Sequence, residues 1–164
     1  VAAGMFKGLT ETNFGVNVTM DRAMLVTVLY RLDGSPDVSG YENRFSDVSS
    51  SQYCYDALLW GSHNNISNGY ADGTFAPNET LTREQLVTFL HRYANYKGYN
   101  TDVYADIGYS DAQQVSSFAR ESMCWAIGAG IINGTSSTTL SPKGSAVRSQ
   151  VAVMFNRFAG GMAF

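Results

Sequence analysis

Three stretches of the chain carry apolar residues at intervals of three and four positions, the spacing that places side chains on one face of a helix. In the middle stretch these residues are Leu86, Phe89, Leu90 and Tyr93. In the first stretch they are Leu25, Val28, Leu29 and Leu32. In the last stretch they include Val151 and Phe155. Each stretch is predicted to form an amphipathic helix that buries one face in a core.

The residues before these stretches predict where the helices begin. Thr82 and Gln85 have the Thr-x-x-Gln spacing of a capping box. Asp21 holds the equivalent place before the first helix, and its side chain can accept a hydrogen bond from a backbone N–H of that helix. Val147, before the last helix, has no side-chain acceptor. The first two helices are therefore predicted to be capped by side chains.

The three helices belong to an internal repeat. Shifts of 61 and then 65 residues bring Arg22, Arg83 and Arg148 into register, and the second shift places Trp60 on Trp125. We predict three repeats packed as one compact unit, at residues 1–44, 45–103 and 104–164. Repeat 1 holds only the second half of a repeat. An N-terminal segment or a partner chain is expected to complete it.

Each complete repeat is predicted to begin with another helix, after a polar lead-in at residues 45–48 or 104–107. The helical spacing in repeat 2 involves Tyr53, Ala57 and Trp60, and in repeat 3 Phe118, Ser122 and Trp125. Asn-Gly pairs at residues 68–69 and 133–134 are predicted to end these helices, because glycine accepts a left-handed backbone. A loop follows, with a turn at Asp72 and Gly73 in repeat 2.

Composition limits the classes of partner. The 164 residues are 45% hydrophobic, enough for one sizeable core. A net charge of -3, from 11 basic and 14 acidic residues, gives no basic field to hold nucleic acid. The sequence has no apolar run of about 18 residues, so no membrane insertion is expected.

The reactive residue types indicate no metal site, cofactor or catalytic group. Cys54 and Cys124 lack metal-ligand spacing and could form one disulfide or remain buried free thiols. His63 and His91 are expected on the surface or on a helix face. The turn at Asp72 lacks the alternating carboxylates of a calcium loop.

Several motifs resemble the bacterial S-layer homology (SLH) domain, in an array of three. They are Phe-Ser-Asp-Val at 45–48, the segments 66–78 and 81–85, and the helix starts at 20–24 and 146–150. The resemblance implies an all-α fold in which three helical repeats pack in a pseudo-threefold arrangement, with grooves between neighbours. It also implies a location outside the cell, at the bacterial cell surface or in the cell wall.

The resemblance further implies non-covalent anchoring, by binding a secondary cell-wall polysaccharide that carries a pyruvate ketal on an amino sugar. The arginine of the helix start helps to bind this ligand in the family. The chemistry fits, because a guanidinium pairs with a carboxylate through two hydrogen bonds and a helix N-terminus adds backbone donors. The candidate ligand-binding residues are Arg83, Arg22, Arg148, Thr82, Trp60, Trp125, Tyr70, Asp72 and Gly73.

Some of these residues also have structural explanations. Trp60 and Trp125 have the spacing of core residues as well as flat faces for a sugar. A second set of repeated arginines, Arg31, Arg92 and Arg157, lies near helix C-termini, where the helix dipole favours a cation, and is assigned a structural role. Asp21 and Val147 stand where the middle repeat has threonine, so one or two working grooves are expected, Arg83 being part of one.

Two alternative functions can be tested against the same residues. The grooves of a diverged array could receive another protein chain, which would make this a protein-protein interaction module. A glycan hydrolase would need two carboxylates facing one cleft. Glu84 and Asp72 are the nearest candidates, but capping and turn roles explain them better, so the chain is not expected to be an enzyme.

Overall fold

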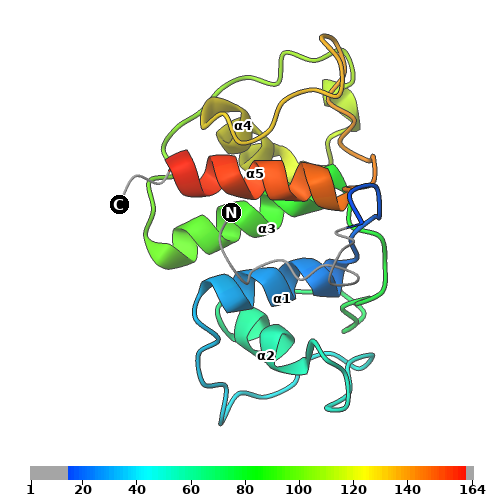
Figure 1. Cartoon of the computed structure of the whole chain (residues 1–164), viewed down its shortest axis with the longest axis vertical. Helices are drawn as coiled ribbons and strands as arrows, with labels where there is room; N and C mark the ends of the chain where they lie inside the picture. Colours follow the sequence, from blue (N-terminus) through cyan, green and yellow to red (C-terminus); the bar gives the residue numbers. More distant parts are fainter. Residues whose placement is uncertain (1–14, 162–164) are drawn as a thin grey trace. The chain divides into compact units, whose positions relative to one another are not determined.

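The computed structural model describes residues 15–161, and the regular structure in this range is helical (Figure 1). The α-helices are α1 (Arg22–Leu32), α2 (Tyr55–His63), α3 (Arg83–Lys97), α4 (Arg120–Gly128) and α5 (Arg148–Gly161). Two short 3-10 helices, η1 (Ala112–Gln114) and η2 (Ser117–Ala119), precede α4. Within residues 15–161, β pairing is limited to three isolated bridges. The predicted all-α class is confirmed.

Contacts between residues divide the described chain into two compact units. Unit 1 comprises Gly15 and residues 20–80, with α1 and α2. Unit 2 comprises residues 16–19 and 81–161, with α3, α4 and α5. The boundary falls inside repeat 2, so the helix of repeat 1 is grouped with the first half of repeat 2. The repeat boundaries and their pseudo-threefold packing stay predictions, and the completion of repeat 1 concerns residues outside the described range.

In unit 1, α1 and α2 lie side by side and enclose the core (Figure 1). Leu25 and Leu29, from the predicted apolar face of α1, are fully buried. Trp60 of α2 is also buried, with its ring 5.7 Å from the ring of Tyr30. The helical spacing read from the sequence therefore identifies the buried face of α1.

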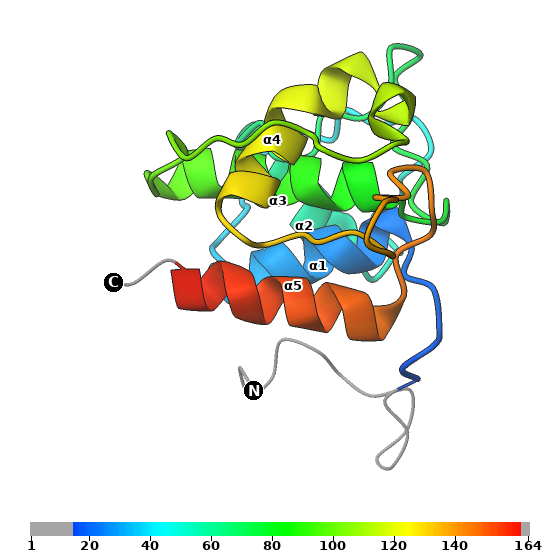
Figure 2. The same ribbon diagram turned by 90° about the horizontal axis from the view of Figure 1, so that it is seen from above.

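In unit 2, α4 packs against α3, as Figure 2 shows. Leu86 and Leu90 on α3 are fully buried. Phe158 connects α5 to both helices, because its ring lies 6.1 Å from that of Tyr93 on α3 and 6.2 Å from that of Trp125 on α4. Aromatic contacts of this kind fix the place of α5 within the unit.

The predicted helix starts are confirmed. Thr82 and Gln85 form a reciprocal capping box at α3. Asp21 accepts a 2.7 Å hydrogen bond from the backbone N–H of Met24 at α1. Asp21 and Thr82 thus satisfy backbone donors that α1 and α3 leave unpaired.

The predicted ends of α2 and α4 are wrong. The helices end at His63 and Gly128, several residues before the Asn-Gly pairs. The chain turns away at Asn65 and Gly130, which have positive φ angles of 58° and 68°. The glycine of the first Asn-Gly pair, Gly69, has another role, since a Cβ there would lie 2.5 Å from the Phe45 ring. That glycine allows the loop to pack closely, and does not end the helix.

Tyr53 and Phe118 also depart from the prediction. They were expected on the apolar face of the first helix of repeat 2 and of repeat 3. Instead they precede α2 and α4 and are 65% and 55% exposed. The apolar spacing extended one turn too far, because an aromatic residue just before a helix reads like a residue within it.

The two cysteines, Cys54 and Cys124, are buried free thiols. His63 is exposed and stacks on Tyr41. His91 lies on a buried face of α3, where burial lowers its pKa and its ring lies 3.1 Å from the Ser122 hydroxyl. Within residues 15–161, no helix is long and apolar enough to cross a membrane, and no cluster of side chains could hold a metal ion.

Candidate functional site

The three helix starts with the repeated arginines share one backbone arrangement. The N–H groups of Arg22 and Ala23 donate to the carbonyl oxygens of Glu79 and Pro77 in unit 1. In unit 2 the same positions of α3 donate to Gly144 and Pro142, and those of α5 to Val18 and Val16. These protein carbonyls occupy backbone donors that were expected to face an anion. The expectation that the helix N-termini offer free backbone donors is wrong for these positions.

The arginine side chains continue this pattern. Arg22 Nε donates to the Phe75 carbonyl at 2.9 Å, and Arg83 Nε donates to the Leu140 carbonyl at 3.0 Å. Arg83 Nη2 also donates to the Asn133 carbonyl at 2.6 Å. Both side chains are buried, and burial lowers the pKa of each guanidinium. The cation in the first turn is therefore met by carbonyl dipoles of a loop, which explains how a helix start tolerates it.

Two aspartates, one for each loop, accept hydrogen bonds from the backbone of the same two loops. Asp47 accepts hydrogen bonds from the N–H groups of Phe75 and Ala76 at 2.8 and 2.7 Å. Asp111 accepts two at 2.8 Å from the equivalent residues Leu140 and Ser141. The Leu140 bond is the main cause that lowers the pKa of Asp111, with further contributions from Ser141 and from the charge of Arg83. Each loop is thus held by an aspartate and an arginine.

These contacts correct the predicted lead-in of repeat 3. Sequence comparison aligned residues 104–107 with 45–48, which would give Asp106 the place of Asp47. The structure gives that place to Asp111. The N–H of Ser46 donates to Gly73, and that of Ser110 donates to Thr138, so the equivalent segment begins at Tyr109. The resemblance of Tyr-Ala-Asp-Ile to Phe-Ser-Asp-Val was misleading.

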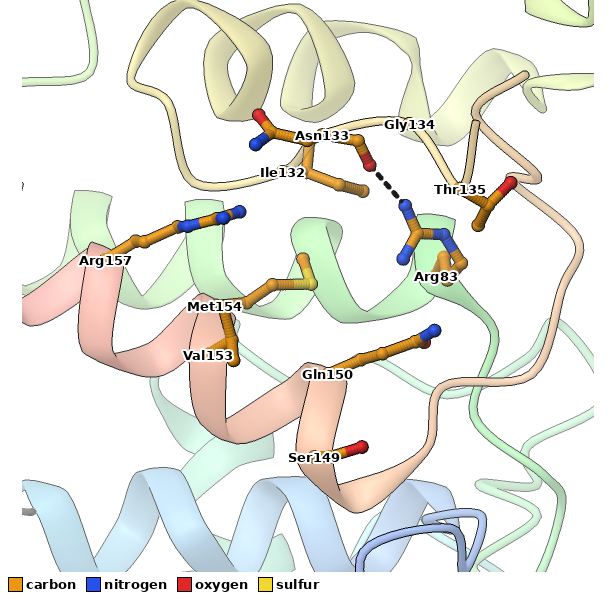
Figure 3. A pocket seen from close by; sticks show the side chains of 10 residues that line it. All are labelled: Arg83, Ile132, Asn133, Gly134, Thr135, Ser149, Gln150, Val153, Met154 and Arg157. Atoms are coloured by element: carbon orange, nitrogen blue, oxygen red, sulfur yellow. Dashed lines mark hydrogen bonds between the residues drawn. The ribbon is translucent and has the colours of Figure 1, made fainter. Parts of the chain in front are cut away.

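Unit 2 contains an open pocket of about 460 Å³ between α3, α5 and the loop after α4 (Figure 3). Its lining residues are Arg83, Ile132, Asn133, Gly134, Thr135, Ser149, Gln150, Val153, Met154 and Arg157. The floor includes the buried apolar side chains of Ile132 and Met154. The pocket therefore combines an apolar surface with polar groups and two cations.

The two arginines reach this pocket from different helices. Figure 3 shows Arg83 at the start of α3 and Arg157 extending from α5 into the same space. Arg157 is exposed and makes no hydrogen bond or ion pair with any residue in the range 15–161. Gln150 adds an acceptor, since its buried Oε1 has no hydrogen-bond partner among the described residues. Such a pocket can bind a small anion that also carries hydroxyl groups.

Comparison with known proteins agrees with this repeated architecture. The family model of the S-layer homology domain matches residues 44–87 and 108–152, more than half of the chain. This chain belongs to the S-layer homology family. Both SLH matches contain a helix-start arginine, Arg83 in the first and Arg148 in the second.

The relatives of this SLH chain are long proteins. An amylopullulanase of Thermoanaerobacterium thermosulfurigenes is 31% identical over 90% of this chain and 8% of its own length. A surface-layer 125 kDa protein of Lysinibacillus sphaericus is 29% identical over 96% of the chain and 13% of its own. A cellulosome-anchoring protein of Acetivibrio thermocellus is 24% identical over 94% of this chain and 35% of its own length. The SLH chain thus spans a minor part of each of these relatives.

The SLH structure separates the predicted site residues into groups. Arg83 lines the pocket of unit 2, and Thr82 caps the helix behind it. Arg148 is buried at the start of α5. Trp60 and Trp125 are 1% and 2% exposed, so in this structure they fill the cores and offer no face to a sugar.

The remaining predicted residues lie in the loop of unit 1. Tyr70 covers the guanidinium of Arg22, whose carbon lies 4.7 Å from the ring centroid. Asp72 accepts from the Thr74 backbone N–H, and Gly73 has a φ of 81°, so both shape an exposed turn. None of these residues lines the pocket of unit 2.

Sequence reasoning missed Arg157 and Gln150 as pocket residues. Arg157 was assigned a structural role from its place near a helix C-terminus, which says nothing about the loop opposite. Gln150 lies two residues after Arg148 in the repeated motif, so its place in the repeat was the available signal. Glu84 and Asp72, the nearest carboxylates for a hydrolase, hold structural contacts instead. Asp72 holds a turn in unit 1 as expected, but the capping role expected for Glu84 is wrong, because Gln85 completes the capping box and buried Glu84 binds Ser116 and Lys143 in unit 2.

Proposed function

We propose that this SLH chain anchors a larger protein non-covalently to an acidic polysaccharide of the bacterial cell wall, with the pocket of unit 2 binding one acidic sugar. The observation that carries the proposal is the pair of arginines, Arg83 and Arg157, directed into one pocket from two helices (Figure 3). Family membership supports it, as do relatives named as surface-layer and cellulosome-anchoring proteins. The protein then acts outside the cell, at the cell surface.

The chemistry of the pocket favours a sugar that carries a carboxylate, such as a pyruvate ketal. Arg157 offers a whole guanidinium, and Nη1 of Arg83 makes no hydrogen bond with the described residues, so both can donate to a carboxylate. Met154 and Val153 give an apolar surface for a ring or for the ketal methyl group. The buried oxygen of Gln150 can accept from a sugar hydroxyl.

The test is binding of the purified chain to cell-wall polysaccharide, with the ketal intact and after its removal by mild acid. Arg157→Ala should weaken binding by about 1.5–3 kcal/mol, roughly tenfold to a hundredfold, the contribution of a hydrogen bond to a charged group. Arg120→Ala is the matched control, because Arg120 is exposed on α4 of the same unit and does not line the pocket.

Three results would count against parts of this proposal. Folded protein that binds neither form of the polymer contradicts anchoring by this route. Equal binding of the two forms would leave anchoring in place but remove the ketal as the recognised group. An Arg157→Ala variant that binds like Arg120→Ala would show that the pocket is not the site.

A further inference from the structure

The loops that receive Arg22 and Arg83 share several hydrogen bonds, which pair their residues at a shift of 65 positions. The arginine Nε donates to Phe75 in one loop and to Leu140 in the other. Within the loops, the N–H of Tyr70 donates to Thr74, and that of Thr135 donates to Thr139. These bonds make Thr135 the counterpart of Tyr70.

A second pair of counterparts follows from the helix starts. The N–H of Arg22 donates to the Glu79 carbonyl, and the N–H of Arg83 donates to the Gly144 carbonyl. The backbones therefore agree at positions where the side chains differ most. Unit 1 has a tyrosine and a glutamate beside its arginine, and unit 2 has a threonine and a glycine.

In unit 1 these two side chains enclose the guanidinium. The carbon of the Arg22 guanidinium lies 4.7 Å from the Tyr70 ring centroid and 4.6 Å from that of Phe75. Glu79 Oε2 lies 4.0 Å from Arg22 Nε and also accepts a hydrogen bond from the Tyr70 hydroxyl. The cation is thus covered by a ring and faced by a carboxylate that are bonded to each other.

We propose that Tyr70 and Glu79 form an internal occupant of the Arg22 site, and that Thr135 and Gly144 leave the Arg83 site open for ligand. The proposal rests on the proposed function. An acidic sugar would bring a carboxylate to the arginine and would need the space over its guanidinium, the two places that Glu79 and Tyr70 hold at Arg22. Such a sugar would have to displace Tyr70 and would bring its carboxylate against Glu79, a like charge that opposes binding. Arg22 is therefore withheld from the ligand that Arg83 can bind.

The geometry of unit 2 indicates that a tyrosine and a glutamate can be introduced beside Arg83 at the positions of Thr135 and Gly144. A Cβ built on Gly144 would lie 3.7 Å from Arg83 Cδ, so a glutamate there would start beside the arginine as Glu79 does. The same Cβ would lie 3.1 Å from the Ser141 carbonyl oxygen, so the turn would have to shift by a few tenths of an ångström. Thr135 already lines the pocket. Tyrosine and glutamate at these two positions should close it.

The first experiment compares the native chain with Thr135→Tyr/Gly144→Glu in binding to the pyruvylated polysaccharide. We expect a loss of about tenfold or more from the like charge and the covered guanidinium. Thr135→Tyr/Gly144→Gln keeps the size and removes the charge, so it should bind more tightly than the glutamate variant. If the native chain binds and a folded glutamate variant binds equally well, the proposal is overturned.

The second experiment does not depend on the polysaccharide. Phenylglyoxal modifies exposed arginines, and mass spectrometry locates the adducts. Arg22 and Arg83 are both 5% exposed, but only the Arg22 guanidinium is covered by Tyr70 and faced by Glu79, which are half exposed, so Tyr70→Thr/Glu79→Gly should raise the labelling of Arg22 severalfold. Unchanged labelling would overturn the proposal even if the transferred variant failed to fold. A native chain that does not bind the polymer would refute the proposed function alone, since the labelling result would stand.

Discussion

Arg83→Ala should destabilise unit 2, although Arg83 also lines the proposed ligand pocket. The side chain donates two hydrogen bonds that hold the loop after α4, to the Leu140 and Asn133 carbonyls. Hydrogen bonds from a charged donor contribute roughly 1.5–3 kcal/mol each. Relief of the buried charge offsets part of this, so we expect a net loss of about 2–4 kcal/mol.

The chain offers a probe for each unit, because Trp60 lies in unit 1 and Trp125 in unit 2. In a Trp60→Phe background, the fluorescence of Trp125 during urea unfolding reports unit 2. Arg83→Ala is compared there with Arg157→Ala, a pocket residue without hydrogen bonds to residues 15–161. Arg157→Ala should unfold within about 0.5 kcal/mol of the parent, as surface substitutions usually do.

Unchanged stability of Arg83→Ala would refute a stabilising role for Arg83. If Arg83→Ala unfolds within about 0.5 kcal/mol of its parent, the hydrogen bonds to the loop do not stabilise the unit, and the arginine serves only the ligand. A loss of binding by that variant with unchanged stability would support the same conclusion. Loss of both properties together is what the structure predicts, so binding data on Arg83 variants need a stability measurement beside them.

Two further predictions concern carboxylates of unit 2. Asp111→Asn should destabilise the unit at neutral pH, and the gap to the parent should close as pH falls from about 3.9 through the lowered pKa of the folded state; a gap independent of pH in urea titrations would contradict this. Glu84 is buried and accepts from Ser116 and from Lys143, which is half exposed. Lys143→Ala should therefore cost about 3 kcal/mol, because it leaves the buried carboxylate of Glu84 without its cation, and a loss below about 1 kcal/mol, as for an exposed ion pair, would refute this.

Local signals in the sequence identified most of the helical structure. The apolar spacing located the buried face of α3, and the Thr-x-x-Gln motif located its start, since both depend on residues within two turns. The ends of α2 and α4 were missed because the chain turns at Asn65 and Gly130, where the backbone φ is positive. Neither residue belongs to the Asn-Gly pairs from which the ends were predicted.

The site was harder to predict, because its contacts join distant residues. Asp111 binds a loop about thirty positions later, and the choice between Asp106 and Asp111 could not be made without that loop. The repeated arginine was correctly located, but a sequence cannot show whether a carbonyl oxygen or a ligand meets the cation. Arg157 gains its importance only from the loop that faces it.

The half-repeat offset between the sequence period and the compact units has a practical consequence for dissecting SLH arrays. A fragment of residues 45–103 corresponds to one sequence repeat, but it separates the loop at Phe75 from the Arg22 that binds it. A fragment of residues 20–80 keeps both. Cuts made at sequence boundaries therefore expose loops that have lost their arginine, and domain exchange between arrays should be designed at the helix start, where the arginine and its loop move together.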